Sequence, residues 1–384
     1  MSAACPACGA AAGEPFLALH RLPVNPSQRS PTRAQATSVS VRDVLLTFCD
    51  RCAMIWNPEF DPAALDYDAE YENSLHFSPV FQQYAQELAG RLVERYGIRN
   101  KTVVEIGSGK GEFLALVCER GDNRGIGFDP TYDGESDAAA NGRVRFVPEL
   151  YGEQTAVEAD LVVFRHVLEH VADPLGFLQG IRRAIGEGEP VVYCEVPAAE
   201  YLLWERAVWD VIYPHCSVFA APALLYLFER AGLRVLDSGF SFGGQYLWVE
   251  ATPDSEVKAV LPQAEAAALQ PLVDSFSADV QAQRARWAET LTATNGDGVA
   301  LWGGGAKGTT FLNLVRGAEH VGAVVDLNPR KQGTFVPGTG HPIVAPEALV
   351  GRAPGRVIVM NPVYRDEIAA RLAELDLRPE LDVI

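Results

Sequence analysis

Three glycines follow a run of β-branched residues, and their spacing is the strongest indication of a ligand-binding site in this chain. Residues 102–129 read TVVEIGSGKGEFLALVCERGDNRGIGFD, and the glycines of the turn are Gly107, Gly109 and Gly111. Glycines at a strand-to-helix turn let the backbone approach a ligand closely, because no Cβ stands in the way. Asp129, at the end of the next apolar run, is placed to accept hydrogen bonds from a ribose diol. The segment is therefore expected to bind an adenosine-type cofactor.

The glycine spacing distinguishes two classes of cofactor. The dinucleotide fingerprint is G-x-G-x-x-G, whereas this chain has G-x-G-x-G. Glu105 precedes the first glycine, where an acid is unfavourable beside a pyrophosphate but suits the cationic amino-acid end of S-adenosylmethionine. We favour that cofactor over a nicotinamide, and over an empty tight turn, which would leave Glu105 and Asp129 unexplained. Further cofactor contacts are expected from Ser108, Pro130, Glu149, Leu150 and His166.

Two C-x-x-C pairs stand near the N-terminus, Cys5 with Cys8 and Cys49 with Cys52. Four thiolates make a tetrahedral Zn²⁺ site, and each C-x-x-C turn can supply two of them. A redox-active C-x-x-C is the alternative, but it does not need a second pair. We therefore expect a structural zinc ion that holds the N-terminal module together. The remaining cysteines are expected to be core or pocket thiols: Cys118, Cys194 and Cys216.

The composition limits the partners and the compartment. The chain has 384 residues, with 32 Lys and Arg against 50 Asp and Glu, and a formal charge of −18. This charge argues against nucleic acid or an anionic membrane as the main partner and leaves a small molecule as the expected one. No apolar run approaches the roughly 20 residues of a membrane span, and residues 1–11 lack the features of a signal peptide. We expect a cytoplasmic, reducing location without disulfides, and the sequence leaves the oligomeric state open.

Alternating strand and helix patterns must position these residues. Residues 61–98 have a helical pattern with regularly spaced aromatic side chains. The alternation that follows predicts a mostly parallel sheet with helices on both faces. Gly243 and Gly244 join the last two strands tightly, so the last of seven strands is expected to be antiparallel. The strands are expected near residues 102–106, 124–128, 143–147, 160–164, 190–195, 233–239 and 245–250.

A second, smaller unit of the same kind is expected at the C-terminal end. Residues 255–292 have helical periodicity and are interpreted as one or two connecting helices. From residue 298 a strand, a glycine turn and a helix follow one another, as in the first unit. Those glycines either bind a nucleotide or only form a tight corner. The expected division is a zinc-binding module over 1–60, a cofactor-binding domain over 61–254, and a connector with a Rossmann-like domain over 255–384.

Two histidine-bearing segments follow strands at the edge of the sheet where open α/β folds bind ligands. His166 and His170 are four residues apart, which suits one face of a helix and a pocket-lining role; a metal site there would lack an evident third ligand. His215 lies on a loop, since Pro214 interrupts a helix, and it is our candidate for a general base because imidazole titrates near neutral pH. Tyr213 beside it is expected to polarise a carbonyl or hold an enolate. The alternative is a surface loop without a chemical role.

Several of these segments together resemble the zinc-containing sugar C-methyltransferases, which act on nucleotide-linked 4-keto deoxysugars. The resemblance covers nearly the whole chain. It implies a class I methyltransferase fold, with a Rossmann-like seven-stranded sheet between an N-terminal zinc-binding module and a smaller C-terminal Rossmann-like α/β domain. It rests on the two C-x-x-C pairs, VVEIGSGKGEF, HVLEHVADP, the loop at 212–217, GGQYLWV at 243–249, GGGAKGTT at 303–310 and VVDLNPRKQGTFVPGTGHPI at 324–343.

The resemblance also implies S-adenosylmethionine-dependent methylation of a carbon beside a ketone. His215 then matches the base of the family, Tyr213 its neighbouring tyrosine and His170 a second pocket histidine, while Lys307 is expected to face a substrate diphosphate.

The chain departs from the family pattern at two places where the sugar would bind. Pro214 stands where the family carries an acid beside its base, and Asn73 stands where it carries a tyrosine. We keep Asn73 and His76 as expected substrate contacts. The departures leave O- or N-methylation of another sugar or small metabolite as the alternative activity.

Overall fold

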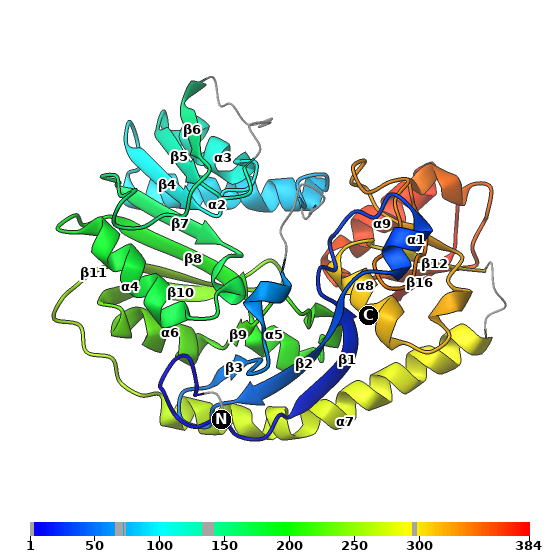
Figure 1. Ribbon diagram of the computed structural model, residues 1–384. Coiled ribbons are helices and arrows are strands. Elements are labelled where there is room, and N and C mark those ends of the chain that lie inside the picture. The colour runs from blue at the N-terminus through cyan, green and yellow to red at the C-terminus, as the bar shows by residue number, and fades with distance from the viewer. Residues whose placement is uncertain (1–3, 66–71, 73, 133–141, 294–297) are drawn as a thin grey trace.

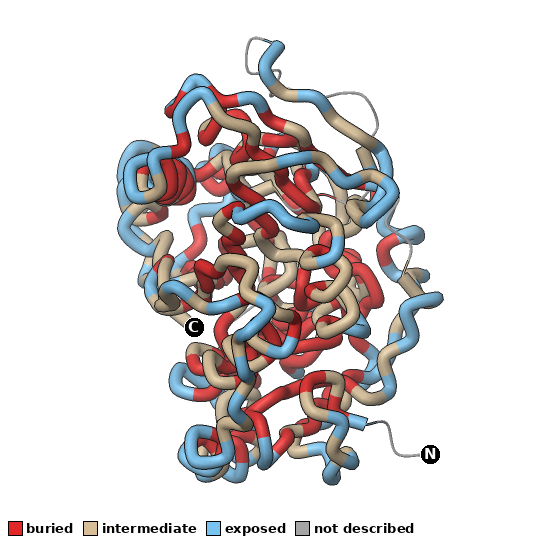
Figure 2. The backbone as a smooth tube through the Cα atoms, turned by 90° about the vertical axis from the view of Figure 1, so that its left-hand side faces the viewer, coloured by how far each residue is buried: buried red, intermediate tan, exposed pale blue. Residues whose placement is uncertain are grey.

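Three β-sheets organise the chain. The computed structural model describes residues 4–65, 72, 74–132, 142–293 and 298–384. A four-stranded sheet, a seven-stranded sheet and a five-stranded sheet are joined by helices. In Figure 1 the long helix α7 (Gln263–Ala293) runs beneath the N-terminal strands, from the side of the seven-stranded sheet to the side of the C-terminal domain. Figure 2 shows the buried segments gathered in the interior and the exposed ones on the loops around them.

The seven-stranded sheet confirms the predicted α/β architecture. Its order is β10-β11-β8-β7-β4-β5-β6, and β11 alone among these strands runs antiparallel to both of its neighbours. The tight connection before β11 contains Gly243 and Gly244, both with positive φ. The strands are β4 (Thr102–Ile106), β5 (Arg124–Phe128), β6 (Val144–Val147), β7 (Leu161–Arg165), β8 (Val191–Pro197), β10 (Leu233–Ser241) and β11 (Tyr246–Pro253).

Helices cover both faces of this sheet. On one face, α2 (Pro79–Tyr96) and α3 (Glu112–Gly121) share an apolar core with the inner residues of β4 and β7. On the other face, α4 (Pro174–Ile185) and α6 (Ala221–Arg230) share a second core that also contains buried cysteines of the N-terminal module. The carboxyl ends of the parallel strands therefore form one edge between two helical layers.

The prediction of helix over 61–98 is wrong at its beginning. Helix α2 begins at Pro79, where the Ser78 hydroxyl accepts the N–H of Phe81 and caps the first turn. A serine followed by proline is a start signal for a helix, because proline at the first position loses no intrahelical hydrogen bond. Before Ser78, the described residues of this region contain only a short 3₁₀ turn, η1 (Pro62–Ala64).

The N-terminal sheet borrows one strand from the central part of the chain. Its order is β1-β2-β3-β9, and β9 pairs antiparallel with β3 through three residue pairs. The loop that carries His215 is therefore held between the N-terminal sheet and the seven-stranded sheet. The elements here are β1 (Leu17–Pro23), α1 (Arg33–Thr37), β2 (Val41–Phe48), β3 (Met54–Trp56), α5 (Ala199–Trp204) and β9 (Ser217–Phe219).

The C-terminal domain is a five-stranded parallel sheet in the order β14-β13-β12-β15-β16, as expected for a Rossmann-like unit. The connector before it is the single helix α7, whose buried side chains share one core with the N-terminal strands and with this domain. The domain boundaries stay a prediction. The remaining elements are β12 (Val299–Trp302), α8 (Ala306–Leu314), β13 (Ala323–Val325), β14 (Ile343–Val344), β15 (Arg356–Val359), α9 (Arg365–Glu374) and β16 (Glu380–Val383).

A bilayer would need a helix that is both long and apolar. Within the described ranges, no helix has both the length and the apolar character that a membrane span needs.

Candidate active site

The glycine turn after β4 is closed by a carboxylate. Gly107, Gly109 and Gly111 all have positive φ, a conformation that side chains disfavour. The N–H of Gly109 donates to Asp129 Oδ2 at 2.7 Å, so the carboxylate at the end of β5 lies over the turn. Ser108 is buried beside it. The structure thus brings the predicted glycine turn and Asp129 together at the carboxyl edge of β4 and β5, and we call the turn of residues 107–111 with Asp129 the glycine crease.

A side chain at Gly107 is expected to disturb this turn strongly. A Cβ there would lie 2.3 Å from Cγ2 of Val167, whose branched side chain has little freedom to move. Gly109 is the matched control, since its φ is also positive but a Cβ added there would meet no atom within 4 Å. We expect Gly107→Ala to lower the free energy of unfolding by roughly 2–5 kcal/mol and Gly109→Ala by about 1–2 kcal/mol. Urea denaturation of both variants measures this, and equal losses would contradict the close approach.

Glu105 occupies a buried position between the glycine turn and α3. Its Oε2 accepts the N–H of Leu114 at 3.1 Å, one of the first-turn donors that a helix leaves without an internal partner. Burial raises the pKa of Glu105 to about 8, helped by Glu112 and Asp129 and opposed by Arg165. The carboxyl group is therefore largely protonated near neutral pH in the ligand-free protein.

This raised pKa predicts a pH-dependent affinity for the cofactor. A bound ammonium group favours the charged carboxylate, so binding should release up to about one proton from Glu105. The affinity for S-adenosylhomocysteine should rise with pH until the carboxyl is already ionised, at about pH 8. Calorimetry in two buffers of different ionisation enthalpy measures the released proton, and Glu105→Gln should abolish it. Identical heats in both buffers with the wild-type protein would place the ammonium group elsewhere.

The remaining predicted cofactor contacts lie near the same edge. Pro130 directly follows Asp129, and Glu149 and Leu150 follow β6. All three are exposed, and the Leu150 side chain is 76% exposed. Their contact with the cofactor stays a prediction.

Sequence reasoning missed a buried ion pair beside the crease. Arg165, at the end of β7, donates from Nε and Nη2 to Glu195 Oε1 at 3.0 and 2.8 Å. The other oxygen of Glu195 accepts the hydroxyls of Tyr193 and Tyr84. Burial alone would raise the pKa of Glu195, but Arg165 and His166 hold it well below its usual range. The sequence did contain a signal for this ion pair, because each of the two apolar strands carries one charged residue at an inward position.

His166 lies between two buried carboxylates. Its Nε2 is 3.3 Å from Glu195 Oε1, and its Nδ1 is 3.6 Å from Glu169 Oε1. Burial alone would lower the pKa of His166, but the two carboxylates raise it to about 8. The prediction that His166 and His170 share a helix face is wrong. His166 has a left-handed backbone, with φ of 55°, and only a short 3₁₀ turn, η3 (Leu168–His170), follows it.

The predicted base and the second pocket histidine are brought together. The rings of His170 and His215 are 4.9 Å apart and nearly perpendicular. His170 Nδ1 lies 3.1 Å from the carbonyl oxygen of Pro214; since a carbonyl only accepts, Nδ1 carries the hydrogen and Nε2 the lone pair. Burial, followed by the charge of His170, lowers the pKa of His215 to about 3. A carboxylate oxygen of Glu169 and one ring nitrogen of each histidine lie within 4.8 Å of one another.

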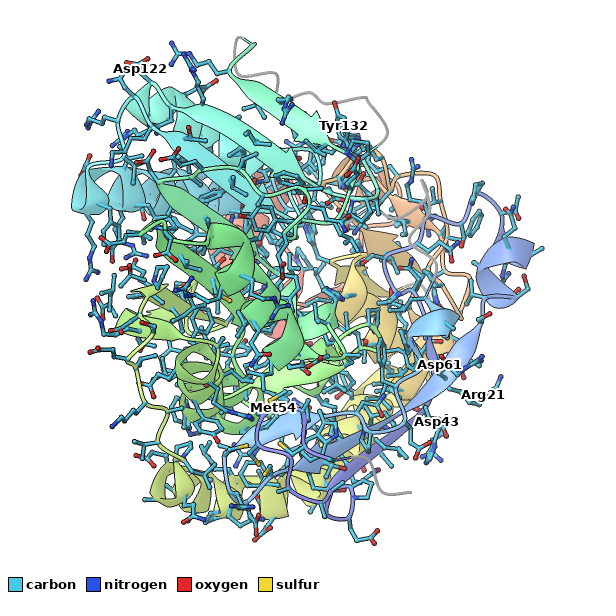
Figure 3. The ribbon with its side chains drawn as sticks, turned by 60° about the vertical axis from the view of Figure 1, so that its left-hand side comes forward. Arg21, Asp43, Met54, Asp61, Asp122 and Tyr132 are labelled. Carbon is cyan, nitrogen blue, oxygen red and sulfur yellow. The ribbon has the colours of Figure 1, made fainter. Side chains whose placement is uncertain are left out.

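The Tyr213 hydroxyl is hydrogen-bonded to the backbone of Asp61. It accepts the N–H of Asp61 at 3.0 Å and lies 3.2 Å from the Asp61 carbonyl, to which it donates. Tyr213 lines a recess with Arg21 and Asp43 on the N-terminal sheet; Figure 3 labels Arg21, Asp43 and Asp61. An enolate contact would require the hydroxyl to leave Asp61, and this role of Tyr213 stays a prediction.

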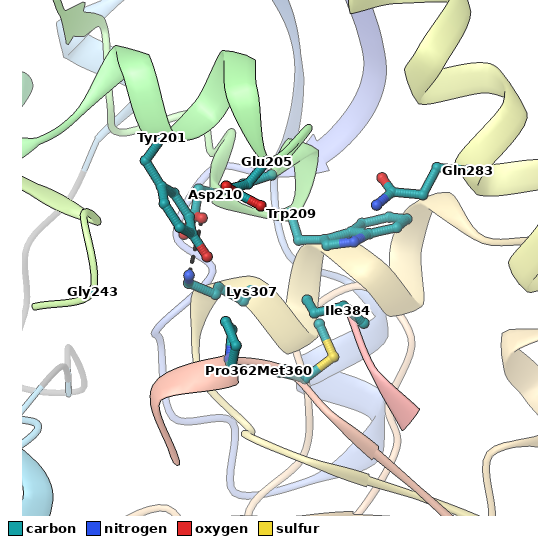
Figure 4. A pocket seen from close by; sticks show the side chains of 11 residues that line it. Tyr201, Glu205, Trp209, Asp210, Gly243, Gln283, Lys307, Met360, Pro362 and Ile384 are labelled. Atoms are coloured by element: carbon teal, nitrogen blue, oxygen red, sulfur yellow. Dashed lines mark ion pairs between the residues drawn. The ribbon is translucent and has the colours of Figure 1, made fainter. Parts of the chain in front are cut away.

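Lys307 lies in a recess between the seven-stranded sheet and the C-terminal domain. The recess has a volume of about 320 Å³. Lys307 Nζ is 2.9 Å from Asp210 Oδ2 and 3.0 Å from Gln245 Oε1. Figure 4 shows the lysine and Asp210 facing each other beside the ring of Tyr201. A diphosphate group would therefore compete with Asp210 for the ammonium group.

The other two predicted substrate contacts lie before α2. Asn73 is outside the described residues. The ring of His76 packs edge-to-face on Phe81, with centroids 5.1 Å apart. Burial lowers the pKa of His76, with Glu112 opposing this effect and Arg165 adding to it. His76 is thus close to the Arg165 side of the crease, as a pocket residue would be.

The four N-terminal cysteines form one cluster. Cys5 Sγ is 3.6 Å from Cys52 Sγ, and Cys8 Sγ is 3.5 Å from Cys49 Sγ. These distances are too long for a disulfide bond of about 2.05 Å. They are close to the edge of about 3.8 Å that a tetrahedron with Zn–S bonds of about 2.3 Å requires. The cluster belongs to the same core as Met54 on β3, which Figure 3 labels, and its donor set fits a zinc ion.

Comparison with known proteins indicates the class of enzyme. A model described as a methyltransferase domain matches residues 81–238, and one described as a C-methyltransferase C-terminal domain matches residues 246–378. C-methyltransferase NovU of Streptomyces niveus is 29% identical over 308 residues, which cover 74% of this chain and 72% of that protein. The chain is thus similar to C-methyltransferases over both of these regions. The matched methyltransferase domains identify it as an S-adenosylmethionine-dependent methyltransferase.

Solved structures similar to this methyltransferase include two methyltransferases with bound S-adenosylhomocysteine. The Burkholderia thailandensis 1,6-didemethyltoxoflavin-N1-methyltransferase is 22% identical, with a TM-score of 0.36, over 46% of this chain and 81% of that one. CalO1, a methyltransferase in calicheamicin biosynthesis, is 20% identical, with a TM-score of 0.35, over 44% of this chain and 54% of that one.

The matched methyltransferase domain decides between the cofactors considered from the sequence. It supports S-adenosylmethionine over a nicotinamide. The residues that contact it stay a prediction, because the crease around Gly107 and Asp129 is described without a ligand.

Proposed function

We propose that this methyltransferase acts on a nucleotide-linked 4-keto deoxysugar, through an enolate. A ketone at C4 acidifies the neighbouring C3–H bond, so a base can remove that proton. The observation that carries the proposal is the paired His170 and His215, at the carboxyl edge of the sheet that also bears the glycine crease. When bound, S-adenosylmethionine supplies an electrophilic methyl group to the carbon nucleophile that forms.

The protonation state of the histidine pair supports this role. A general base must be unprotonated when the substrate arrives. The pKa of His215 is lowered to about 3 in the ligand-free protein, so its ring is neutral near pH 7. The near-neutral titration expected from the sequence is therefore wrong for the ligand-free protein, and the ring is a weak base until a nearby negative charge raises its pKa. Two imidazolium ions at this separation would repel each other, so at most one of the two rings is positively charged at a time.

The proposal places the anionic, polar end of the substrate at the recess around Lys307, where the diphosphate must displace Asp210 from the ammonium group and where Glu205 adds a second negative charge. Lys307 reaches the recess from the C-terminal domain, and Gln245 reaches it from the connection that precedes β11. Gln245 also exchanges hydrogen bonds of 2.9 Å with the amide of Asn361. A lysine with neighbouring amides suits a diphosphate and a nucleoside, and such a substrate would span from this recess toward the histidine pair.

Methyl transfer with a labelled cofactor tests the proposal. The enzyme is incubated with methyl-labelled S-adenosylmethionine and a panel of nucleotide-linked 4-keto deoxysugars, and we expect label on carbon in at least one sugar. In deuterium oxide with S-adenosylhomocysteine, the same sugar should take up deuterium at C3, since only the enolate route exchanges that hydrogen. Label in no sugar would count against the proposal. Label without C3 exchange would favour O- or N-methylation instead.

A further inference from the structure

One buried carboxylate at the site has no hydrogen-bond donor. The Glu169 side chain is 1% exposed, and neither of its oxygens has a hydrogen-bond partner among the described residues. Removing a carboxylate from water is costly unless a positive charge or donors compensate. His166 Nδ1 lies 3.6 Å from Glu169 Oε1, and the raised pKa of this ring gives it a positive charge near pH 7. That one charge is shared with Glu195, so it compensates Glu169 only in part.

Histidines surround this carboxylate. The side chains of Glu169, His170 and His215 converge within 4.8 Å. The Glu169 carbonyl accepts the Cys216 thiol at 3.4 Å, which ties η3 to the loop that carries His215. The other titratable groups that influence Glu169 and these rings are His166, Glu195 and the thiols of Cys194 and Cys216. Burial raises the pKa of both thiols, so they are neutral near pH 7.

We propose that Glu169 is the acid partner of the histidine base. Its negative charge stabilises the imidazolium that forms when His215 accepts the substrate proton. In the family that the sequence resembles, an acidic residue stands next to the base, and this chain has Pro214 there. Glu169, from a different segment, thereby supplies the missing acidic group. This inference rests on the proposed function and extends it with a positioning residue that acts through the two histidines.

The step balances with the groups already named. The C3–H bond breaks, its proton goes to a nitrogen of His215, and the electron pair stays on the sugar as the enolate. The enolate carbon then forms a bond to the methyl group, and the S–CH₃ bond breaks with its electron pair on sulfur. Burial alone would raise the pKa of Glu169, but His166 and His170 hold it below its ordinary value. The carboxylate is therefore charged before the proton arrives.

Titration of the histidines in the substrate-free protein tests the pairing directly. The full chain with ¹³C-labelled imidazoles is followed by NMR, and signals are assigned with single His→Asn variants. Glu169 raises the pKa of His170 and of His166, so Glu169→Gln should move both titrations to lower pH. Glu200→Gln is the matched control: Glu200 is also buried, but it caps α6 through the N–H of Ala221. An unchanged His170 titration in Glu169→Gln would overturn the inference.

A second variant covers the case in which Glu169→Gln does not fold. Glu169→Asp keeps the charge and withdraws it by one methylene group, so both histidine titrations should shift in the same direction by a smaller amount. Metal analysis of the wild-type protein tests the other explanation, that Glu169 and the two histidines bind a metal ion. A divalent ion bound beyond the cysteine site, and lost in the Glu169 variant, would overturn the inference, because the three groups would then be ligands.

The kinetic consequence separates this inference from the proposed function. With a sugar that the wild-type enzyme exchanges, Glu169→Gln should slow C3 deuterium exchange by roughly 10- to 1,000-fold. Its pH–rate profile should shift to lower pH, and affinity for S-adenosylhomocysteine should stay unchanged. If no sugar exchanges with the wild-type enzyme while the histidine titrations shift as expected, the sugar assignment fails and the charge pairing stands. If exchange is normal in Glu169→Gln, the charge pairing fails and the sugar assignment stands.

Discussion

Replacement of His215 by asparagine should reduce methyl transfer by roughly 10²–10⁴-fold, the contribution of a positioned general base. Asparagine keeps a polar side chain of similar reach but cannot accept a proton at working pH. His215 lies outside the glycine crease, so the affinity for S-adenosylhomocysteine should be unchanged. Transfer rates with a labelled cofactor and calorimetry with S-adenosylhomocysteine measure the two quantities separately.

His20 offers a matched control for this variant. Its side chain is 68% exposed and pairs with Asp43 on the N-terminal sheet, far from the crease in the chain. His20→Asn should leave the transfer rate unchanged. An unchanged rate in His215→Asn would remove His215 from the role of base, and an equal loss in both variants would point to a general effect on folding.

Loss of one cysteine ligand should have the largest effect on stability. Cys5→Ser removes one of four thiolates, and a structural zinc site contributes its binding free energy directly to folding. We expect the variant to lose the metal and several kcal/mol of stability, which lowers Tm by about 10 °C or more. Metal analysis and thermal denaturation measure this. Cys118→Ala is the matched control, because Cys118 is a buried cysteine in a different core and should leave the metal content at its wild-type value.

The two measurements on Cys5→Ser must agree. Unchanged metal content together with unchanged melting would contradict the zinc assignment. A fall in Tm without loss of metal would show that the serine only disturbs the core around Met54.

The seven-stranded sheet was predictable because each strand carries its own local signal. Runs such as Thr102–Ile106 are β-branched and end in glycine or aspartate, and the alternation with helices then dictates the topology. The short strand Ser217–Phe219 could not be found in this way. Three residues carry no periodicity, and this strand exists because β3 pairs with it. The start of α2 at Pro79 was missed because the cap formed by Ser78 and the following proline was not weighed against the aromatic spacing.

In the candidate site, too, the local features could be predicted from the sequence and the long-range contacts could not. The crease is nearly local, since Gly109 and Asp129 are only 20 residues apart, and its spacing made it visible in the sequence. The ion pair of Arg165 with Glu195 joins two strands, and Tyr84 reaches the same carboxylate from a distant helix. The charges of Arg165 and Glu195 stand out in their apolar strands, but no local pattern shows that the two residues pair, or that Tyr84 joins them, until the sheet is assembled.

The pairing of β3 with β9 places the cysteine cluster at one end of a short ladder and His215 at the other. β3 begins just after Cys52, and β9 begins just after Cys216, the neighbour of His215. Met54 pairs with Phe219 and Trp56 with Ser217, so the register of this ladder links the cysteine cluster to the loop that carries His215. Disorder that begins at the cysteine cluster should therefore reach the position of His215 through three residue pairs, without passing through the seven-stranded sheet.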